Sequence, residues 1–283
     1  MNLKFLYFKK VSFTAFFMCF ITVTSVTHAF SVEPNKRIYS DVSYGLEGAG
    51  NQKLDLYLPQ ESIRKAPVHA YVHGGAWTKG DKDSLKIREV KSYLDHGIIV
   101  ASLNYNLQKY PNNLQDIAKA SQWLNNNITK YDGDPNNMVL SGHSAGAHLV
   151  ALLGVKEHVD FKAIFPVDSA SYDLSHKTDG GLIGRWIARQ KRIVFGDNVD
   201  DLKKASPIYQ VRKDAHYPPF HIYVTAERSE AVTEAKRFNN ILKNAGQVSS
   251  IIVLDEDLSH ADMKKEIFHS NSPIFKGIIK VLN

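Results

Sequence analysis

The chain has 283 residues, and its 35 lysines and arginines exceed its 29 acidic residues to give a formal net charge of +6. This excess is small and dispersed, so it gives no support to a nucleic-acid-binding function. The single cysteine excludes a disulfide framework, and the length fits one α/β domain that is held by its hydrophobic core.

The first 29 residues have the composition of an export signal. A basic stretch, "MNLKFLYFKK", precedes the apolar run "VSFTAFFMCFITVTSV", and "THA" ends in a small residue before Phe30. An uncleaved membrane anchor is the alternative, but serine and threonine interrupt the apolar run, which is short for a membrane span. Cleavage would remove three lysines, no acid and the cysteine, so the formal charge would fall from +6 to +3. We therefore expect a signal peptide over residues 1–29 and an exported domain over 30–283, periplasmic or secreted, with no stable membrane anchor.

The rest of the chain alternates strand-like and helix-like patterns. The strand-like runs are "KLDLYLP", "PVHAYVHGG", "GIIVASLNY", "NMVLSG", "FKAIFPVD", "PFHIYVTAE" and "SSIIVLDED". The first of them alternates and ends at a proline, which is typical of an edge strand. Helical spacing is found in "LQDIAKASQWLNNNI", "AHLVALLGV" and "EAVTEAKRFNNILKNAG". This alternation predicts an α/β fold with a mostly parallel sheet and helices on both faces. The pattern gives no indication of an oligomeric state.

One segment, residues 169–207, interrupts this alternation because it contains no clear strand. In α/β enzymes, an insertion between core strands often covers the site at the carboxyl ends of the strands. We therefore predict a lid or a pocket wall here, with a passive surface excursion as the alternative.

The pentapeptide "GHSAG" places Ser144 between two glycines, directly after a predicted strand and before a predicted helix. Small residues could serve only to pack the helix close to the sheet. The strand–turn–helix context favours a second interpretation, in which a sharp turn presents the serine hydroxyl as a nucleophile. The NH of Ala145, at the start of the helix, would then donate to a developing oxyanion.

A second motif, "HGGAW", follows the strand-like run "VHAYV". Glycines after a strand allow backbone NH groups to point into a cleft, although an ordinary turn has the same composition. Because it precedes the serine motif in the chain, we interpret it as the other half of an oxyanion hole. Gly75 and Ala76 would supply NH groups, and Gly74 would shape the turn.

Together, these motifs resemble those of the α/β-hydrolase esterases of the hormone-sensitive-lipase and arylformamidase type. The matching stretches are "QKLDLYLP", "HGGAWTKGDK", "NYNL" with "YPNNLQDIAKASQWL", "LSGHSAGAHL", "ASYDL" and "LSHADM", in the family's order over about residues 40–282. The resemblance implies an α/β-hydrolase fold and acyl-transfer chemistry, but it does not fix a substrate. Together with the insertion predicted above, we expect a small lid, a small-molecule ester as the substrate and no cofactor. No HExxH motif or cysteine cluster in the sequence suggests a metal site.

The order of catalytic residues in this fold is serine, acid, histidine. His260 follows the last predicted strand and is expected to be the general base. The resemblance places the acid after "FHIYV", where the family usually has aspartate, but this chain reads "TAERSE" there. We predict Glu227 as the acid, with Glu230 as the alternative. Both carboxylates could instead be solvated charges at the start of a helix.

These assignments predict an exported serine carboxylesterase acting on short- to medium-chain esters through an acyl-enzyme. Two alternatives share the same scaffold: an amidase of arylformamidase type and a catalytically inactive binding module. The substrate pocket is expected to include four aromatic residues: Trp77, Tyr105, Tyr172 and Trp186.

Overall fold

The computed structural model describes residues 37–45, 50–107, 109–157, 159–176 and 181–283. The predicted signal peptide lies outside these residues. The described residues belong to one compact unit, Glu33–Asn283. Among the described residues, no helix has both the length and the apolarity that a membrane span requires.

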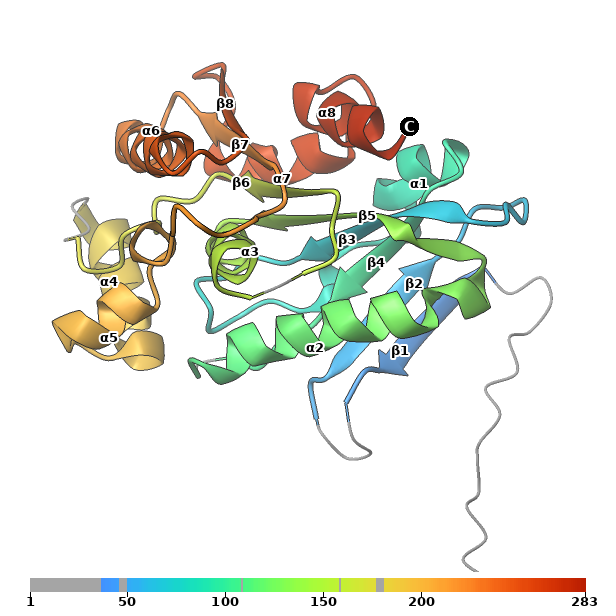
Figure 1. Cartoon of the computed structure of the whole chain (residues 1–283), viewed down its shortest axis with the longest axis horizontal. Helices are drawn as coiled ribbons and strands as arrows, with labels where there is room; N and C mark the ends of the chain where they lie inside the picture. The colour runs from blue at the N-terminus through green and yellow to red at the C-terminus, as the bar shows by residue number, and fades with distance from the viewer. Residues whose placement is uncertain (1–36, 46–49, 108, 158, 177–180) are drawn as a thin grey trace, which may run out of the picture. The chain divides into compact units, whose positions relative to one another are not determined.

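The core is one eight-stranded sheet with the strand order β1-β2-β4-β3-β5-β6-β7-β8 (Figure 1). Its strands are β1 Ile38–Ser43, β2 Lys53–Tyr57, β3 Ala66–Val72, β4 Ile99–Leu103, β5 Gly133–His143, β6 Ala163–Val167, β7 Phe220–Thr225 and β8 Ser249–Leu254. The pairs β1–β2 and β2–β4 are antiparallel. All pairs from β4 to β8 are parallel. The mostly parallel sheet that the sequence predicts is confirmed.

The first predicted strand, β2, is not at the edge of the sheet, contrary to the sequence-based expectation. It pairs with both β1 and β4, and the edge strand is β1. In β1 only two of six side chains are buried, and the register with β2 shifts between Tyr39 and Val42. This irregular pattern lacks the alternation from which strands are recognised in a sequence.

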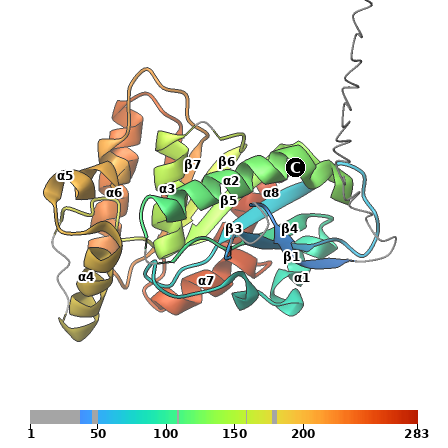
Figure 2. The same cartoon turned by 90° about the horizontal axis from the view of Figure 1, so that it is seen from below.

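Helices cover both faces of the sheet. They are α1 Ile87–Asp95, α2 Asn112–Asn127, α3 Ala145–Lys156, α4 Gly181–Phe195, α5 Val199–Lys204, α6 Ser229–Asn244, α7 His260–Phe268 and α8 Pro273–Leu282, with short 3₁₀ helices at Lys82–Ser84, Ile128–Tyr131 and Pro207–Tyr209. Helices α1, α7 and α8 contact one another, and α2 contacts α3 on the other face (Figure 2). Phe220 of β7 contacts Phe238 of α6 and lies close to Gly154 of α3, so α6 shares the face of α3.

The central helix α3 is apolar all round because it is enclosed. Every residue from Ala145 to Val155 is buried, against β5, β6 and α2. Two glycines make this close packing possible. A methyl group on Gly146 would lie 2.3 Å from the carbonyl oxygen of Val72, and one on Gly154 would lie 2.8 Å from the ring of Phe220. Gly146 of the "GHSAG" motif therefore serves to pack the helix close to the sheet. This packing role does not explain the serine of the motif.

The register of the parallel strands places three chain segments at one edge of the sheet. His143 of β5 pairs with Val167 of β6, and Val167 pairs with Tyr223 of β7. The next residues, Ser144 and Asp168, therefore emerge side by side. Their NH groups donate to the carbonyl oxygens of Val167 and Tyr223, at 3.0 and 2.8 Å.

The segment 169–207 forms no strand among its described residues and contains α4 and α5, in agreement with the sequence-based expectation. Helix α4 exposes four apolar side chains, Leu182, Ile183, Trp186 and Ile193. Arginines at positions 185, 189 and 192 are also exposed on this helix.

Candidate active site

Ser144 sits at the turn between β5 and α3 with φ +58° and ψ −117°. A non-glycine residue rarely adopts this backbone conformation, and it is found mainly where function requires it. Glycine is needed on both sides, because a methyl group on Gly142 would lie 2.5 Å from the backbone of Gly146. The sharp turn directs the serine Oγ away from the sheet edge toward the loop before α7.

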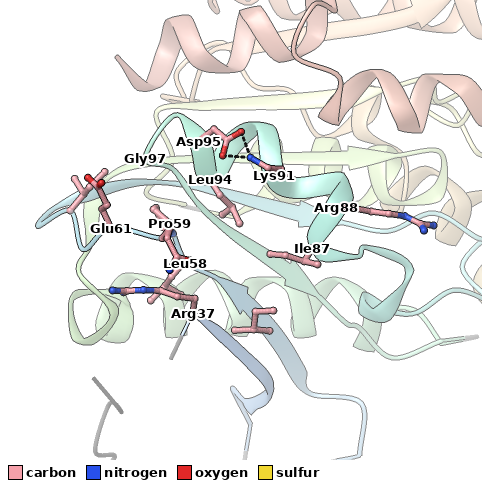
Figure 3. Close-up of a pocket in the computed structure, with 13 residues that line it drawn as sticks. Arg37, Leu58, Pro59, Glu61, Ile87, Arg88, Lys91, Leu94, Asp95 and Gly97 are labelled. Atoms are coloured by element: carbon pink, nitrogen blue, oxygen red, sulfur yellow. Dashed lines mark hydrogen bonds and ion pairs between the residues drawn. The ribbon is translucent and has the colours of Figure 1, made fainter. Parts of the chain in front are cut away.

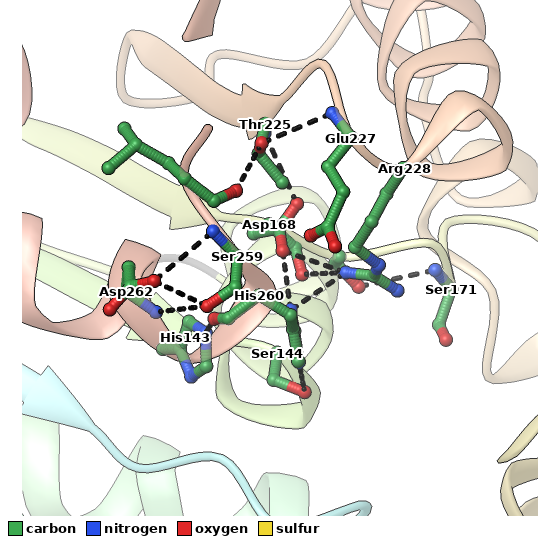
Figure 4. Close-up of polar contacts among 12 residues, drawn as sticks. His143, Ser144, Asp168, Ser171, Thr225, Glu227, Arg228, Ser259, His260 and Asp262 are labelled. Atoms are coloured by element: carbon green, nitrogen blue, oxygen red, sulfur yellow. Dashed lines mark hydrogen bonds and ion pairs between the residues drawn. The ribbon is translucent and has the colours of Figure 1, made fainter. Parts of the chain in front are cut away.

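His260 contacts Ser144 from the first turn of α7. Its Nε2 lies 2.9 Å from the Oγ of Ser144 (Figure 4). His260 is the first residue of α7, and a capping box between Ser259 and Asp262 fixes the start of this helix. The structure therefore brings together the nucleophile and the base that the sequence predicts.

The carboxylate that contacts His260 is Asp168, whose Oδ2 is hydrogen-bonded to the Nδ1 of the imidazole. Asp168 directly follows β6, has a left-handed backbone with φ +56°, and its side chain is fully buried. Burial raises the pKa of this carboxyl, but His260 and the guanidinium of Arg228 outweigh burial and hold the pKa below its usual value. Asp168 is therefore ionised at neutral pH and can orient an imidazole.

The structure does not support Glu227 as the acid. Glu227 lies in the turn between β7 and α6, its side chain is exposed, and the described contacts of His260 include none to it. The next residue, Arg228, reaches Asp168 and His260 instead. Glu230, the alternative, is the second residue of α6 and likewise has no described contact with His260. The carboxylate that contacts His260 therefore follows β6, whereas the sequence-based expectation placed it after β7.

The sequence did contain a signal for Asp168. The run "FKAIFPVD" ends in an aspartate at the carboxyl end of a buried strand. Because β6 is the neighbour of both β5 and β7, an acid at its end can reach the same histidine as an acid at the end of β7.

The glycine loop after β3 lies against the serine turn. A methyl group on Gly74 would lie 3.0 Å from the Cβ of Ser144, so a larger residue would fit here only if its neighbours shifted. Gly75 and Ala76 have positive φ values of 120° and 48°, and the carbonyl of Gly75 accepts the NH groups of Thr78 and Lys79. The loop is thus turned tightly beside Ser144, and Ala145 begins α3 on the other side, where the first NH groups have no acceptor within the helix.

Helix α4 contacts this loop at three successive residues. The ring of Trp77 packs edge-on against Phe195 at 5.2 Å between centroids. The Thr78 hydroxyl donates to the Oε1 of Gln190 at 3.0 Å, and the Nζ of Lys79 lies 5.7 Å from the centre of the Trp186 ring. The segment 169–207 is therefore packed on the loop next to Ser144.

Three of the four aromatic residues predicted to form a substrate pocket are buried in packing. Trp77 donates from Nε1 to the Nδ1 of His148. Tyr105 stacks on His73, and Tyr172 stacks on Phe238. All three are at most 2% exposed, so they shape the core beneath the site. Trp186 is 41% exposed and is the one of the four that a substrate could touch.

His143, in the serine motif, contacts His260 at the start of α7. Its ring lies 4.6 Å from that of His260. Burial first, and then the neighbouring His260, lower its pKa to about 3. The neutral ring can then donate from Nε2 to the carbonyl oxygen of His260, 2.8 Å away. His143, Asp168 and His260 form the one group of potential metal ligands found in the described part of the chain, but their ligand atoms already form the hydrogen bonds given above.

A groove of about 740 Å³ lies elsewhere, between the start of β1, the β2–β3 connection and α1 (Figure 3). Its lining includes Arg37, Leu58 and Ile63, with Lys91 and Asp95 paired on α1. These residues lie toward the amino ends of β3 and β4, whereas Ser144 lies at the carboxyl end of β5. The groove is therefore separate from the serine site.

Comparison with known proteins places this chain in a family. The BD-FAE family model matches residues 54–238, which is more than half of the chain. The matched region runs from β2 to α6 and includes the glycine loop, Ser144 and Asp168.

Curated relatives extend the similarity. Esterase LipQ of Mycobacterium tuberculosis is 31% identical over 232 residues, which is 73% of this chain and 53% of LipQ. The probable carboxylic ester hydrolase LipM of the same organism is 27% identical over 241 residues, covering 77% of this chain and 54% of LipM. The chain spans about half the length of these relatives.

Solved structures show the same fold at lower identity. A truncated carbohydrate esterase from gut microbiota superimposes with a TM-score of 0.71 at 20% identity, over 88% of this chain and 95% of that one. An inhibited esterase B from Lactobacillus rhamnosis gives 0.71 at 17% identity, over 89% and 87%. The resemblance that the motifs indicated is confirmed. The chain belongs to the BD-FAE family, and its fold is that of the α/β-hydrolases.

Proposed function

We propose that this protein is a serine hydrolase that cleaves carboxylic esters through an acyl-enzyme. One observation carries the proposal: the Oγ of Ser144 lies 2.9 Å from the Nε2 of His260, whose Nδ1 is bonded to the buried Asp168. This order of contacts is that of a serine–histidine–aspartate triad. The names of LipQ and LipM, both described as hydrolases of esters, support the same chemistry.

In the first half of the reaction, the Oγ of Ser144 attacks the acyl carbon of the ester while His260 takes the serine proton on Nε2. Asp168 keeps the other imidazole proton on Nδ1 and stabilises the imidazolium that forms. In this proposal the NH groups of Gly75, Ala76 and Ala145 bind the oxyanion, and Gly74 shapes the turn. His260 then protonates the leaving alcohol, and water repeats these steps on the acyl-enzyme.

A substrate panel tests the reaction class. Purified protein is assayed against p-nitrophenyl esters and against N-formylkynurenine, the substrate expected of an arylformamidase-type amidase. Hydrolysis of esters with little turnover of the formyl amide supports the proposal. The opposite preference would establish the amidase, and no turnover of either would favour an inactive binding module. The chain has no aspartate directly after β7, which would favour such a module, but the contact of Asp168 with His260 supports an active triad instead.

We further propose a preference for short or medium acyl chains. On α4, three exposed arginines, Arg185, Arg189 and Arg192, accompany the four exposed apolar side chains, and this high charge supports a site for water-soluble esters more than one that faces a lipid surface. Initial rates on esters of graded length are expected to be higher for butyrate than for palmitate. Faster hydrolysis of palmitate, with activation at an oil–water interface, would refute this preference.

The export signal remains a proposal that rests on the composition of residues 1–29. Expression of the full chain in a bacterium with a periplasm should yield a mature protein that begins at Phe30. Amino-terminal sequencing of the periplasmic fraction checks the cleavage site. An uncleaved chain in the membrane fraction would show that the segment is an anchor instead.

A further inference from the structure

Arg228 contacts both Asp168 and His260, on the Nδ1 side of the imidazole that faces away from Ser144 (Figure 4). It immediately precedes α6, and its side chain is 26% exposed. Its Nη1 lies 3.0 Å from the carbonyl oxygen of Asp168, 2.8 Å from the Oδ2 of the same residue and 2.8 Å from the Nδ1 of His260. The mechanism described above gives this guanidinium no part.

We propose that Arg228 is a positioning residue of the active site, which holds the Asp168 carboxylate against His260 and keeps a fixed positive charge beside the imidazole. The inference rests on the proposed function, since it assigns a role within the same triad. It also accounts for the "TAER" turn, which provides a cation where the resemblance led us to expect the acid.

Asp168 needs such a partner because its side chain is fully buried. A buried carboxylate is strongly destabilising unless it is paired and hydrogen-bonded. The backbone NH of Thr225 reaches the Oδ1 of Asp168 only at 3.4 Å, so His260 and Arg228 make the close contacts, both at Oδ2. Without the guanidinium, the carboxylate would be held mainly by the histidine that it is supposed to orient.

The number of hydrogens on Arg228 and His260 determines which of their nitrogens can donate to Asp168. The Nη1 of arginine carries two hydrogens and accepts none. The carbonyl oxygen and Oδ2 of Asp168 can accept both, and the Nδ1 hydrogen of His260 then points at Oδ2. In this arrangement the 2.8 Å approach of Nη1 to Nδ1 is a contact between two donors and not a hydrogen bond. Nε2 then has its lone pair facing Ser144, which is the tautomer that a general base requires.

The positive charge also favours the ionised form of Asp168, because the guanidinium lowers the pKa of this carboxyl. Among the other described titratable groups nearby, Asp262 is ionised but is paired with Lys265 and Ser259. Burial and His260 keep His143 neutral, burial raises the pKa of Tyr172 far above its usual value, and Glu227 is exposed. Arg228 and Asp168 are therefore the fixed charges in contact with His260. Loss of the arginine should therefore make the Asp168 carboxylate easier to protonate.

The test compares Arg228→Gln with Arg237→Gln. Arg237 is a matched control, since it also belongs to the α6 region and pairs with a buried aspartate, Asp173, at 2.7 Å, away from His260. Arg228→Gln is expected to lower kcat by about 10- to 100-fold with KM changed less than about threefold. The acidic limb of its kcat/KM profile should move up by about one pH unit. Arg237→Gln is expected to leave both kcat and the limb unchanged.

Two further variants keep the proposal testable if Arg228→Gln does not fold. Arg228→Lys preserves the charge but not the guanidinium, so its acidic limb should stay in place while kcat remains reduced. Guanidinium ion, far below denaturing concentrations, should restore part of the activity of Arg228→Ala. Full activity of Arg228→Lys, or an unmoved limb with normal kcat in Arg228→Gln, would overturn the inference. An inactive wild-type protein would refute the proposed function instead.

Discussion

Replacing Ser144 with alanine is expected to lower kcat for ester hydrolysis by about 10⁴-fold or more while the protein remains folded. The Oγ is the attacking atom in the proposed reaction, and His260 is its one described side-chain partner. Alanine removes the nucleophile but keeps the Cβ of this tight turn. Steady-state kinetics on a p-nitrophenyl ester, with a melting curve of the same preparation, measure both effects.

A nearby serine supplies the control for this variant. Ser171 lies in the loop after β6, and its backbone NH, not its hydroxyl, bonds to the Oγ of Ser169. Ser171→Ala should therefore retain kcat within about twofold, as is usual for such substitutions away from reacting groups. A Ser144→Ala protein that keeps most of the wild-type activity would contradict the serine-hydrolase mechanism.

Asp168→Asn is expected to lower kcat by about 10⁴-fold. An amide can present its NH₂ group to the Nδ1 of His260, which would favour the imidazole tautomer with its proton on Nε2. That tautomer cannot accept the proton of Ser144. The substitution also leaves Arg228 without its carboxylate partner, so the melting temperature should be measured together with kcat.

Glu227→Gln and Glu230→Gln serve as controls for the acid. Both glutamates lack a described contact with His260, so each change is expected to lower kcat by less than about threefold. A large loss in Glu227→Gln with normal activity in Asp168→Asn would restore the assignment made from the sequence and contradict the arrangement in the structure.

Much of the fold could be predicted because parallel strands buried on both faces appear as continuous apolar runs. All seven predicted strands are present, from β2 to β8. The edge strand β1 could not be recognised, because its exposed side chains and its register shift break the alternating pattern. The position of β2 in the sheet was mistaken for the same reason, since a neighbour that is not recognised makes an inner strand look like an edge.

The site was predicted where local backbone geometry dictates sequence, as at Ser144 between its two glycines. Asp168 was not singled out from the sequence, because only the folded structure shows that this carboxylate lies beside His260. Asp168 and Glu227 both follow strands at the same edge of the sheet, and only the packing shows which carboxylate is buried against His260 and which is exposed. The same limit applies to Tyr105 and Tyr172, because a buried aromatic side chain and one that lines a pocket look alike in a sequence.

The most direct test of the account is covalent labelling with a fluorophosphonate, followed by peptide mass spectrometry. An activated serine nucleophile reacts with this reagent because the phosphorus mimics the attacked acyl centre. We predict one modified residue, Ser144, with labelling abolished in Ser144→Ala and strongly slowed in Asp168→Asn. Failure of the wild-type protein to label, or a label on a different residue, would contradict the assignment of Ser144 as the catalytic nucleophile.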